Sequence, residues 1–364
     1  MKPISIFLLS LCLATVTTAK GQTHNYDTNF QFSQKHFVDT IPIIFEKDQI
    51  YIEATVGGRR CLLNFDTGSS QGAVFGNNIP AGSKPLGTVL TTDANGRRDT
   101  VGVVGLPAMT IGPLRIDGYV ASVFRRQYIR GRYDAILGFD VVNKGLCVKI
   151  DTRKKIMILT DRRDFFDGEP GFGLHYKLKW FVPYLMVSPF KRHVDEVRFD
   201  TGASQLYAMN KQSFDNHAYK SKNVESQVEG RSKGSFTIGT LGAAPTEEVA
   251  FLHLDRLKWG QFRFTDVHAV TTQGASRIGA SMLRYGTVTI NGFRRKITFQ
   301  PYDGGDSVVV DNRPLSVAFV PYEGRAAVGV IYEESDPYKA GMRQGDVVLA
   351  VNGHEIRTFQ QFLD

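Results

Sequence analysis

Cysteine is scarce in this chain, with three residues among 364. So few cysteines exclude a disulfide-rich scaffold, and the spacing of Cys12, Cys61 and Cys147 fits no metal site. Cys61 and Cys147 either form one disulfide in an oxidising compartment or lie as two buried thiols in strands. The sequence leaves both alternatives open.

Several other chemical signatures are missing. The eight histidines include no His-Glu-x-x-His and no paired ligand spacing, and there is no Gly-x-x-x-x-Gly-Lys phosphate loop. The segment Gly68–Gly72 fits the Gly-x-Ser-x-Gly pattern of serine hydrolases, but the strand–helix alternation of that fold is lacking. The sequence therefore predicts no metal site and no bound cofactor.

Apolar runs are short. Ile4–Val16 cannot span a bilayer, and no later stretch is long enough to do so. With Lys2 before this run and Thr-Thr-Ala after it, residues 1–19 have the layout of a signal peptide, which predicts an exported protein, periplasmic or extracellular. Cys12 would suit a lipoprotein signal, but Leu11 stands where that signal has a small residue, so lipid anchoring is not expected.

Positive charge is spread along the chain. The net charge of +8 comes from scattered Lys and Arg, with local clusters at Arg59-Arg60, Arg97-Arg98 and Arg125–Arg132. Most such charges lie in solvated loops, and the alternative is a basic cleft rim that attracts acidic polypeptide or an anionic surface. No nucleic-acid-binding motif accompanies the charge, so nucleic acid is not an expected partner.

The composition favours a folded, mostly β protein. The apolar share is 42%, and short segments rich in Val, Ile, Thr and Phe are separated by Asn, Asp and many of the 36 glycines. A length of 364 residues allows two or three hydrophobic cores.

The tripeptide Asp-Thr-Gly occurs twice, each time at the end of an apolar strand. Asp66–Gly68 follows Leu62–Phe65, and Asp200–Gly202 follows Val197–Phe199. One copy is expected by chance in about one chain in ten of this length, so two copies in matching settings indicate a shared role. Paired carboxylates are what a two-Asp, one-water hydrolytic site requires. The alternative, in which each Asp only caps a turn, does not explain the duplication.

The features around the two tripeptides repeat in the same order. A strand precedes each copy, at Ile50–Val56 and at Tyr184–Val187. The sequence therefore predicts two similar β lobes fused in one chain, which can form a two-fold site as a monomer. The later matching segments are Ile116–Val123 with Phe264–Val270, Ala135–Gly138 with Ser276–Gly279, and the hairpins Val148–Ile158 with Val288–Phe299.

Over about Asp39–Tyr302 these motifs resemble the retropepsin-like branch of the pepsin-type aspartic peptidases, in a fused two-lobe bacterial form. The resemblance implies two similar retropepsin-like β-barrel lobes in a pseudo-two-fold arrangement. It also implies that Leu137-Gly138 and Ile278-Gly279 pass beneath the catalytic loops. Arg277 departs from the pattern, because an apolar residue is usual at that place.

Asp66 and Asp200 are the expected catalytic residues, since two carboxylates held close together share one proton and can activate a water. The hydroxyls of the two threonines can brace one loop against the other, and the two glycines let backbone approach the carboxylates. The residues expected to support the site are Thr67, Gly68, Ser69, Thr201, Gly202 and Ala203.

Ser69 and Ala203 predict unequal aspartates. A Ser69 hydroxyl that donates to Asp66 would lower the pKa of that carboxyl, whereas Ala203 offers no donor to Asp200. Asp66 is therefore expected to carry the charge and Asp200 the proton. The alternative is that Ser69 bonds to local backbone instead.

Each lobe is expected to carry a mobile hairpin that closes over substrate, at Thr91–Arg98 and Val228–Gly234. Ordinary surface hairpins are the alternative, because the same turn residues are common there.

From Leu315 onward the sequence resembles a bacterial PDZ domain, through the pairs Ala340-Gly341 and Gly345-Asp346 and the helix-like start at Thr358–Leu363. An incomplete PDZ-like α+β segment, truncated or vestigial, is expected. The predicted organisation is a signal peptide (1–19), an N-terminal segment (20–38), lobe 1 (39–161), a linker (162–173), lobe 2 (174–302), a second linker (303–314) and the PDZ-like segment (315–364).

The resemblance implies an exported aspartic endopeptidase that hydrolyses polypeptide with a water activated by two Asp residues, without a covalent intermediate. The alternative is a catalytically inactive peptide-binding protein that keeps the cleft and uses the PDZ-like segment as an interaction surface.

Overall fold

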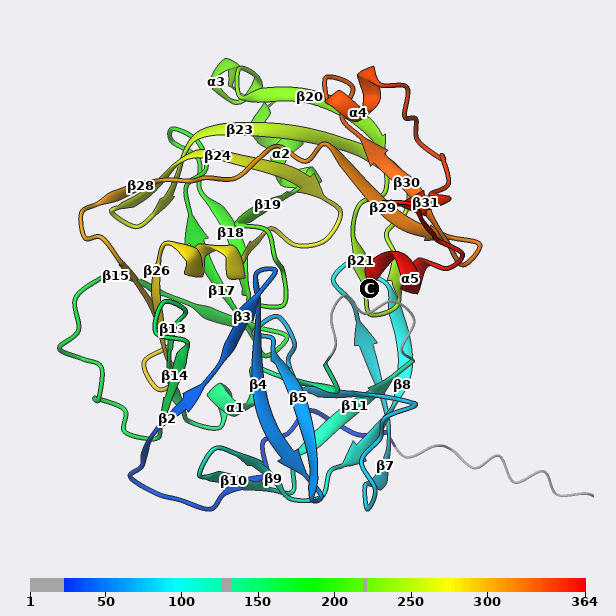
Figure 1. Ribbon diagram of the computed structural model, residues 1–364. Coiled ribbons are helices and arrows are strands. Elements are labelled where there is room, and N and C mark those ends of the chain that lie inside the picture. The colour runs from blue at the N-terminus through cyan, green and yellow to red at the C-terminus, as the bar shows by residue number, and fades with distance from the viewer. Residues whose placement is uncertain (1–22, 126–132, 219–220) are drawn as a thin grey trace, which may run out of the picture.

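The computed structural model describes residues 23–125, 133–218 and 221–364. The predicted signal peptide, with Cys12, and most of the basic cluster at 125–132 lie outside these residues. The chain is mostly β, as predicted, and its two lobes lie one above the other in Figure 1. No helix within the described ranges is both long and apolar enough to cross a membrane.

Lobe 1 is built on an 11-stranded sheet. Its hairpin β4–β5 turns at Gly57 and Gly58, whose φ angles of 57° and 83° are ones that glycine adopts at little cost. The hairpin carries Phe65 into the core and leads directly to Asp66. In sheet order the strands are β1 (Gln31–Phe32), β10 (Leu114–Asp117), β9 (Met109–Ile111), β4 (Gln49–Val56), β5 (Arg59–Phe65), β12 (Ala135–Leu137), β6 (Gly72–Phe75), β11 (Val120–Phe124), β8 (Arg98–Gly105) and β7 (Lys84–Thr92), with β3 (Ile44–Glu46) paired to β4.

Lobe 2 is built on a nine-stranded sheet. Its long strands β23 and β24 form an antiparallel ribbon that curves over the top of the molecule in Figure 1. In sheet order the strands are β16 (Lys177–Lys179), β17 (Val182–Val187), β18 (Asp195–Asp200), β25 (Arg277–Gly279), β19 (Tyr207–Asn210), β24 (Phe262–Thr272), β23 (Glu247–Trp259) and β20 (Val228–Gly234), with β28 (Ser307–Val309) paired to β24.

The two sheets share one topology. In lobe 1, β12 pairs parallel with β5 and antiparallel with β6, and β6 pairs parallel with β11. In lobe 2, β25 pairs parallel with β18 and antiparallel with β19, and β19 pairs parallel with β24. The predicted pseudo-two-fold arrangement of two similar β lobes is therefore confirmed.

A six-stranded sheet joins the lobes. At its centre β13 of lobe 1 pairs antiparallel with β26 of lobe 2, so that Ile150 lies opposite Val288. Both side chains are fully buried and belong to one hydrophobic core that extends through both lobes. The strands are β15 (Phe172–His175), β27 (Lys296–Pro301), β26 (Gly286–Asn291), β13 (Cys147–Asp151), β14 (Ile156–Thr160) and β2 (Val38–Pro42).

The helices of the two lobes are short and lie at the sheet ends. Lobe 2 also has a small hairpin, β21 (Ile238–Gly239) and β22 (Gly242–Ala243). The helices are α1 (Asp140–Asn143), α2 (Lys211–Ala218), α3 (Lys222–Glu225) and the 3₁₀ helix η1 (Ala280–Arg284).

The C-terminal segment packs against lobe 2 beside β20 (Figure 1). Val330 is buried with Val249 and Phe251 of β23, and the backbone N–H of Ser235 donates to the carbonyl of Gly329 at 2.9 Å. The segment is thus continuous with the apolar packing of lobe 2. Its elements are β29 (Val317–Tyr322), β30 (Arg325–Ile331), α4 (Asp336–Lys339), β31 (Ala350–Val351), β32 (His354–Glu355) and α5 (Phe359–Leu363).

Val228–Gly234, expected as a mobile hairpin, is the single strand β20, which pairs antiparallel with β23 and so forms one arm of such a hairpin. Residues 303–314, expected as a linker, include β28, which extends the sheet of lobe 2. Cys61 and Cys147 are both buried and free, which leaves the alternative of two buried thiols.

Candidate active site

The two Asp-Thr-Gly segments form the same turn. The backbone N–H of Gly68 donates to Asp66 Oδ1 at 2.8 Å, and that of Gly202 donates to Asp200 Oδ1 at 3.1 Å. Each carboxyl is therefore fixed by the glycine two residues after it. In both lobes this glycine lies just after the end of the strand that leads to the aspartate, β5 or β18.

The turns meet face to face, and the carboxyls of Asp66 and Asp200 lie close enough for each to act on the pKa of the other. A Cβ atom on Gly68 would lie 2.4 Å from Asp200 Cγ, and one on Gly202 would lie 2.5 Å from Asp66 Cγ. Atoms cannot approach that closely, so only glycine lets the backbone of each turn lie against the carboxyl of the other lobe.

Thr67 and Thr201 cross-link the two turns and are fully buried. Thr67 Oγ1 donates to the carbonyl of Phe199 at 2.8 Å, and Thr201 Oγ1 donates to that of Phe65 at 2.6 Å. Each hydroxyl also accepts the backbone N–H of the other threonine at 3.0 Å. Four reciprocal hydrogen bonds therefore fix the distance between the lobes at the carboxyl pair.

The two hydrophobic-Gly elements lie next to the turns, as expected from the resemblance. The carbonyl of Leu137 accepts the N–H of Asp66 at 3.0 Å, and β25 runs parallel to β18 as far as Asp200. The residue after each glycine makes the same contact in both lobes. The N–H of Phe139 donates to the Ser69 carbonyl, and the N–H of Ala280 donates to the Ala203 carbonyl, both at 2.8 Å.

Arg198 is a site residue that the sequence analysis missed. It lies two residues before Asp200 on β18, on the same side of the strand, and its guanidinium donates to Asp200 Oδ2 at 2.7 Å. Both side chains are largely buried, with 14% and 7% exposed. In lobe 1 the matching residue is Asn64, whose amide donates to Gln49 Oε1 and to the Ile50 carbonyl. The sequence could have indicated the contact of Arg198 with Asp200, because residues two apart in a strand lie on the same side of it.

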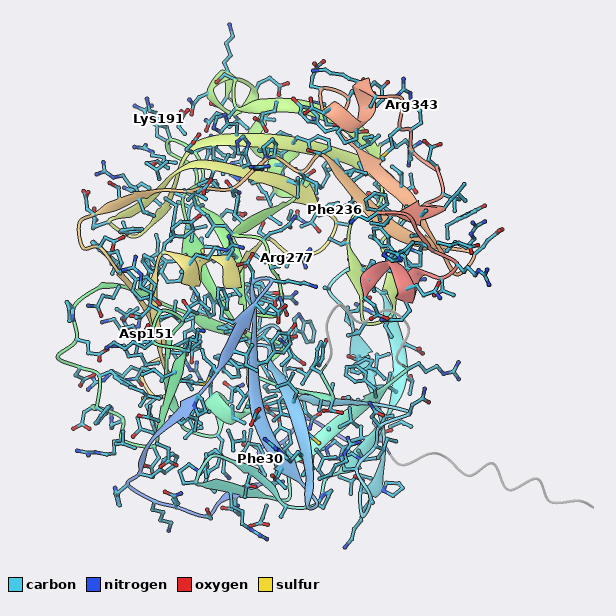
Figure 2. All side chains as sticks on the ribbon, in the orientation of Figure 1. Phe30, Asp151, Lys191, Phe236, Arg277 and Arg343 are labelled. Carbon is cyan, nitrogen blue, oxygen red and sulfur yellow. The ribbon has the colours of Figure 1, made fainter. Side chains whose placement is uncertain are left out.

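Arg277 supplies a second buried cation. It lies where the lobes meet, near the centre of the molecule (Figure 2), and donates to Thr272 Oγ1 at 3.0 Å. Its charge acts on Asp200, so this departure from the usual apolar residue places a compensating charge beside the carboxylate.

These cations make the two carboxyls unequal. Burial alone would raise the pKa of Asp200, but Arg198 and then Arg277 outweigh it, and that pKa is lowered. Burial, followed by the charge of Asp200, raises the pKa of Asp66. The two cations therefore favour the charge on Asp200 and the proton on Asp66, the reverse of the expectation drawn from Ser69. Ser69 Oγ donates to the Gln71 carbonyl at 2.7 Å, which is the alternative of a local backbone partner.

A contact between hairpins also joins the lobes. The turn Asp93–Arg97 between β7 and β8 bonds to the hairpin β21–β22, and we call this contact the interlobe clasp. Asp93 also lies close enough for its charge to act on Arg277. The hydrogen bonds of the clasp are Arg97 Nη1 to the carbonyls of Leu241 (3.2 Å) and Ala243 (3.1 Å), Asn95 Nδ2 to that of Gly242 (3.1 Å), Thr237 Oγ1 to Asn95 Oδ1 (2.8 Å) and Leu241 N–H to Asp93 Oδ2 (3.2 Å).

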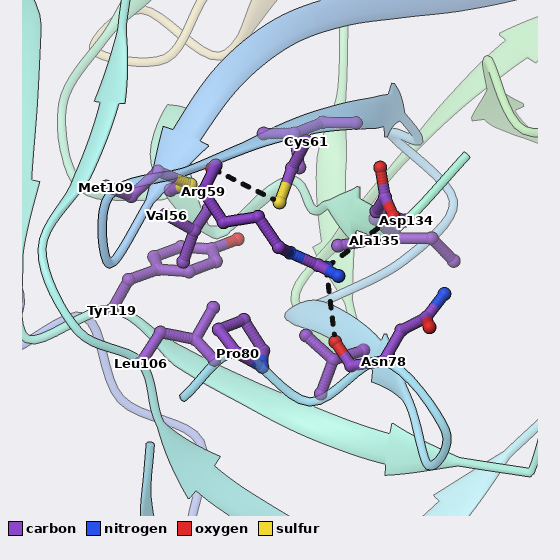
Figure 3. A pocket seen from close by; sticks show the side chains of 13 residues that line it. Val56, Arg59, Cys61, Asn78, Pro80, Leu106, Met109, Tyr119, Asp134 and Ala135 are labelled. Atoms are coloured by element: carbon purple, nitrogen blue, oxygen red, sulfur yellow. Dashed lines mark hydrogen bonds and ion pairs between the residues drawn. The ribbon is translucent and has the colours of Figure 1, made fainter. Parts of the chain in front are cut away.

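A small cavity of about 10 Å³ lies inside lobe 1, among side chains that include Cys61 and Tyr119 (Figure 3). Arg59 lies across it, with its guanidinium 3.4 Å from the Asn78 carbonyl and 3.5 Å from Asp134. The cavity has room for about one water, and neither catalytic candidate lines it. It is therefore a packing defect of the lobe and not a substrate site.

Comparison with protein-family models gives no match, and no curated protein matches the chain. Among solved structures, the chain is similar to the crystal structure of an aspartic proteinase from Irpex lacteus, with 13% sequence identity and a TM-score of 0.49. The match covers 73% of this chain and 97% of that chain. A likeness at this level says nothing about chemistry, so the candidate site depends on its own geometry.

Proposed function

We propose that the protein is an aspartic endopeptidase that acts on polypeptide outside the cytoplasm. The observation that carries the proposal is the close pair of carboxyls Asp66 and Asp200, held by two matching Asp-Thr-Gly turns that Thr67 and Thr201 lock together. A buried carboxyl pair with one proton between them is a catalyst for adding water to a carbonyl. The signal-like residues 1–19 support export.

In this mechanism Asp200 is the base and Asp66 the acid. A water between the carboxyls loses a proton to Asp200 as its oxygen bonds to the peptide carbon, and Asp66 gives its proton to the carbonyl oxygen. The C–N bond then breaks as Asp200 passes its proton to the amide nitrogen and Asp66 regains one from the new hydroxyl. One water is consumed, and no bond forms between enzyme and substrate.

The test is cleavage of an unfolded protein, such as denatured casein, by the purified chain at pH values from about 3 to 8, the range over which such pairs titrate. Asp66→Asn and Asp200→Asn are each expected to lower the rate by about a thousandfold or more, because each removes one of the two proton carriers. Asp117→Asn, an exposed aspartate on β10, is the control and should retain the parent rate.

Two results would contradict the proposal. One is cleavage that persists in either Asn variant when circular dichroism shows an unchanged fold. The other is a parent protein that binds unfolded polypeptide but never cleaves it, which would favour the peptide-binding alternative.

A further inference from the structure

A second group of chemically active side chains lies on the sheet of lobe 2. Glu229, His253 and His268 come from the neighbouring strands β20, β23 and β24, which run side by side in Figure 1. The two histidines are direct cross-strand partners, and their rings stack with centroids 4.4 Å apart. One donor atom from each of the three residues lies within 4.8 Å of the others.

A β-bulge directs Glu229 toward the histidines. Val228 pairs with Leu252 and Gly230 pairs with Phe251, so Glu229 is an extra residue on β20. Bulges re-aim a side chain in this way. The carboxylate reaches both rings, with Oε2 3.1 Å from His268 Nδ1 and Oε1 3.7 Å from His253 Nδ1.

Asp266 holds the far side of His253. Its Oδ1 is hydrogen-bonded to His253 Nε2, and its backbone has φ 60°, a conformation that a residue other than glycine rarely adopts. A histidine that binds a metal usually donates its other ring N–H to a carboxylate in this way. With the proton on Nε2, the lone pair of His253 Nδ1 faces the Glu229 carboxylate, so two electron-rich atoms face each other and a cation between them would be stabilised.

The backbones of all three residues are also fixed. Asn312 accepts the N–H of His268 at 3.0 Å and donates to its carbonyl at 2.7 Å. The N–H of His253 donates to the Gln227 carbonyl at 2.9 Å. The hydroxyl of Tyr332, from the C-terminal segment, donates to the Glu229 carbonyl at 3.0 Å. The cluster therefore lies where the C-terminal segment meets lobe 2.

We propose that Glu229, His253 and His268 bind one divalent transition-metal ion, with zinc the best match, and that Asp266 positions His253. Two imidazoles and a carboxylate are a ligand set that suits zinc. Ligand atoms about 2.0–2.1 Å from a tetrahedral zinc lie about 3.3 Å apart, so the three donors must close in slightly. His253 is 44% exposed and Glu229 21% exposed, which leaves both side chains room to rotate.

The bound ion would have a structural role. It would link β20 to β23 and β24. Because Tyr332 of the C-terminal segment bonds to Glu229 on β20, the ion would also stabilise the packing of that segment against lobe 2. This proposal does not depend on the peptidase activity. The sequence predicted no metal site, because these ligands come from three strands and form no short motif.

The test uses the full chain, stripped of metal with a chelator and desalted. Zinc is titrated by calorimetry and cobalt(II) by its visible absorption, which reports the coordination geometry of the bound ion. We expect one ion per chain. Glu229→Gln, His253→Gln and His268→Gln are each expected to weaken binding by about a hundredfold or more, and Asp266→Asn by about 10- to 100-fold. Zinc should raise the melting temperature of the parent but not of the three ligand variants.

The matched control is His193→Gln. It disrupts the other close histidine pair, in which His193 Nδ1 lies 2.8 Å from His217 Nδ1, and it should leave binding unchanged. The proposal is wrong if the parent binds neither ion more tightly than about 100 μM, weaker than a built site of this kind should be. It is equally wrong if the folded ligand variants bind as the parent does, or if only His193→Gln loses binding. Asp266→Asn keeps the test decisive if a ligand variant fails to fold, because it alters no ligand.

Discussion

Arg198 and Asp200 form a buried ion pair at 2.7 Å on one strand, and the corresponding pair in lobe 1, Asn64 and Asp66, has no such bond. Two turns with the same backbone hydrogen bonds therefore hold carboxyls in different electrostatic surroundings. The pKa of Asp200 is lowered and that of Asp66 is raised. The form of the site with one proton should consequently exist over a wide pH range.

Replacing Arg198 should raise the lower limit of the pH range over which the two carboxyls share one proton. In the proposed mechanism protonation of Asp200 removes the base, and Arg198 opposes this protonation by lowering the pKa of Asp200. In Arg198→Gln that pKa rises, so the acidic limb of the pH–rate profile should move up by about one pH unit or more. The measurement is kcat/KM against pH. Arg153→Gln, which breaks an exposed ion pair with Asp303, should leave the limb in place, and an unmoved limb in active Arg198→Gln would refute the assignment.

Ser69→Ala should leave the pH–rate profile where it is. The Ser69 hydroxyl donates to the Gln71 carbonyl and not to Asp66, so its loss removes no bond to the two carboxyls. Exposed or half-buried polar substitutions of this kind usually change stability by about 1 kcal/mol or less. A shifted acidic limb in this variant would show that the hydroxyl turns toward Asp66 during the reaction.

Thr67→Val should destabilise the fold. It keeps the shape of the side chain but removes the bond to the Phe199 carbonyl and leaves the N–H of Thr201 without its acceptor. Because both groups are buried, the free energy of unfolding should fall by about 2–4 kcal/mol. Chemical denaturation measures it. Thr100→Val, at an exposed position on β8, is the control and should change little. Equal stability of the two variants would mean that the crossed hydroxyls contribute nothing.

Weakening the interlobe clasp should favour large substrates. Arg97→Ala removes two of the hydrogen bonds between the hairpins, so an unfolded chain can enter between the lobes more easily. The ratio of kcat/KM for denatured casein to that for a short peptide is expected to rise about two- to fivefold. Arg98→Ala, the exposed neighbour, serves as the comparison. A parallel fall for both substrates would indicate instead that the clasp helps to form the site.

The sequence predicted the fold class and the position of the paired turns because both depend on local patterns. Alternating strands around two copies of Asp-Thr-Gly define the lobes, and the glycines and threonines have few other uses at such a turn. These features are encoded within a few residues of each aspartate, whereas the place of β12 and β25 was implied by the family resemblance.

The order of protonation could not be predicted, because it depends on where charges lie in space. Ser69 is next to the first turn in sequence yet bonds elsewhere, whereas Arg277 is far from Asp200 in sequence and acts on it through the fold. The clasp and the Glu229–His253–His268 cluster were missed for the same reason. Val228–Gly234 was misjudged because its glycines suggested a turn, while pairing with β23 makes it a strand.

The two lobes belong to one chain and share the sheet in which β13 pairs with β26. This arrangement has an evolutionary consequence. When two identical subunits assemble such a site, one codon specifies the neighbour of both aspartates, and every mutation acts twice. In this protein two separate codons do so, and they encode Asn64 and Arg198. Fusion of the halves therefore allows one aspartate to be specialised as the base by mutations that leave its counterpart untouched.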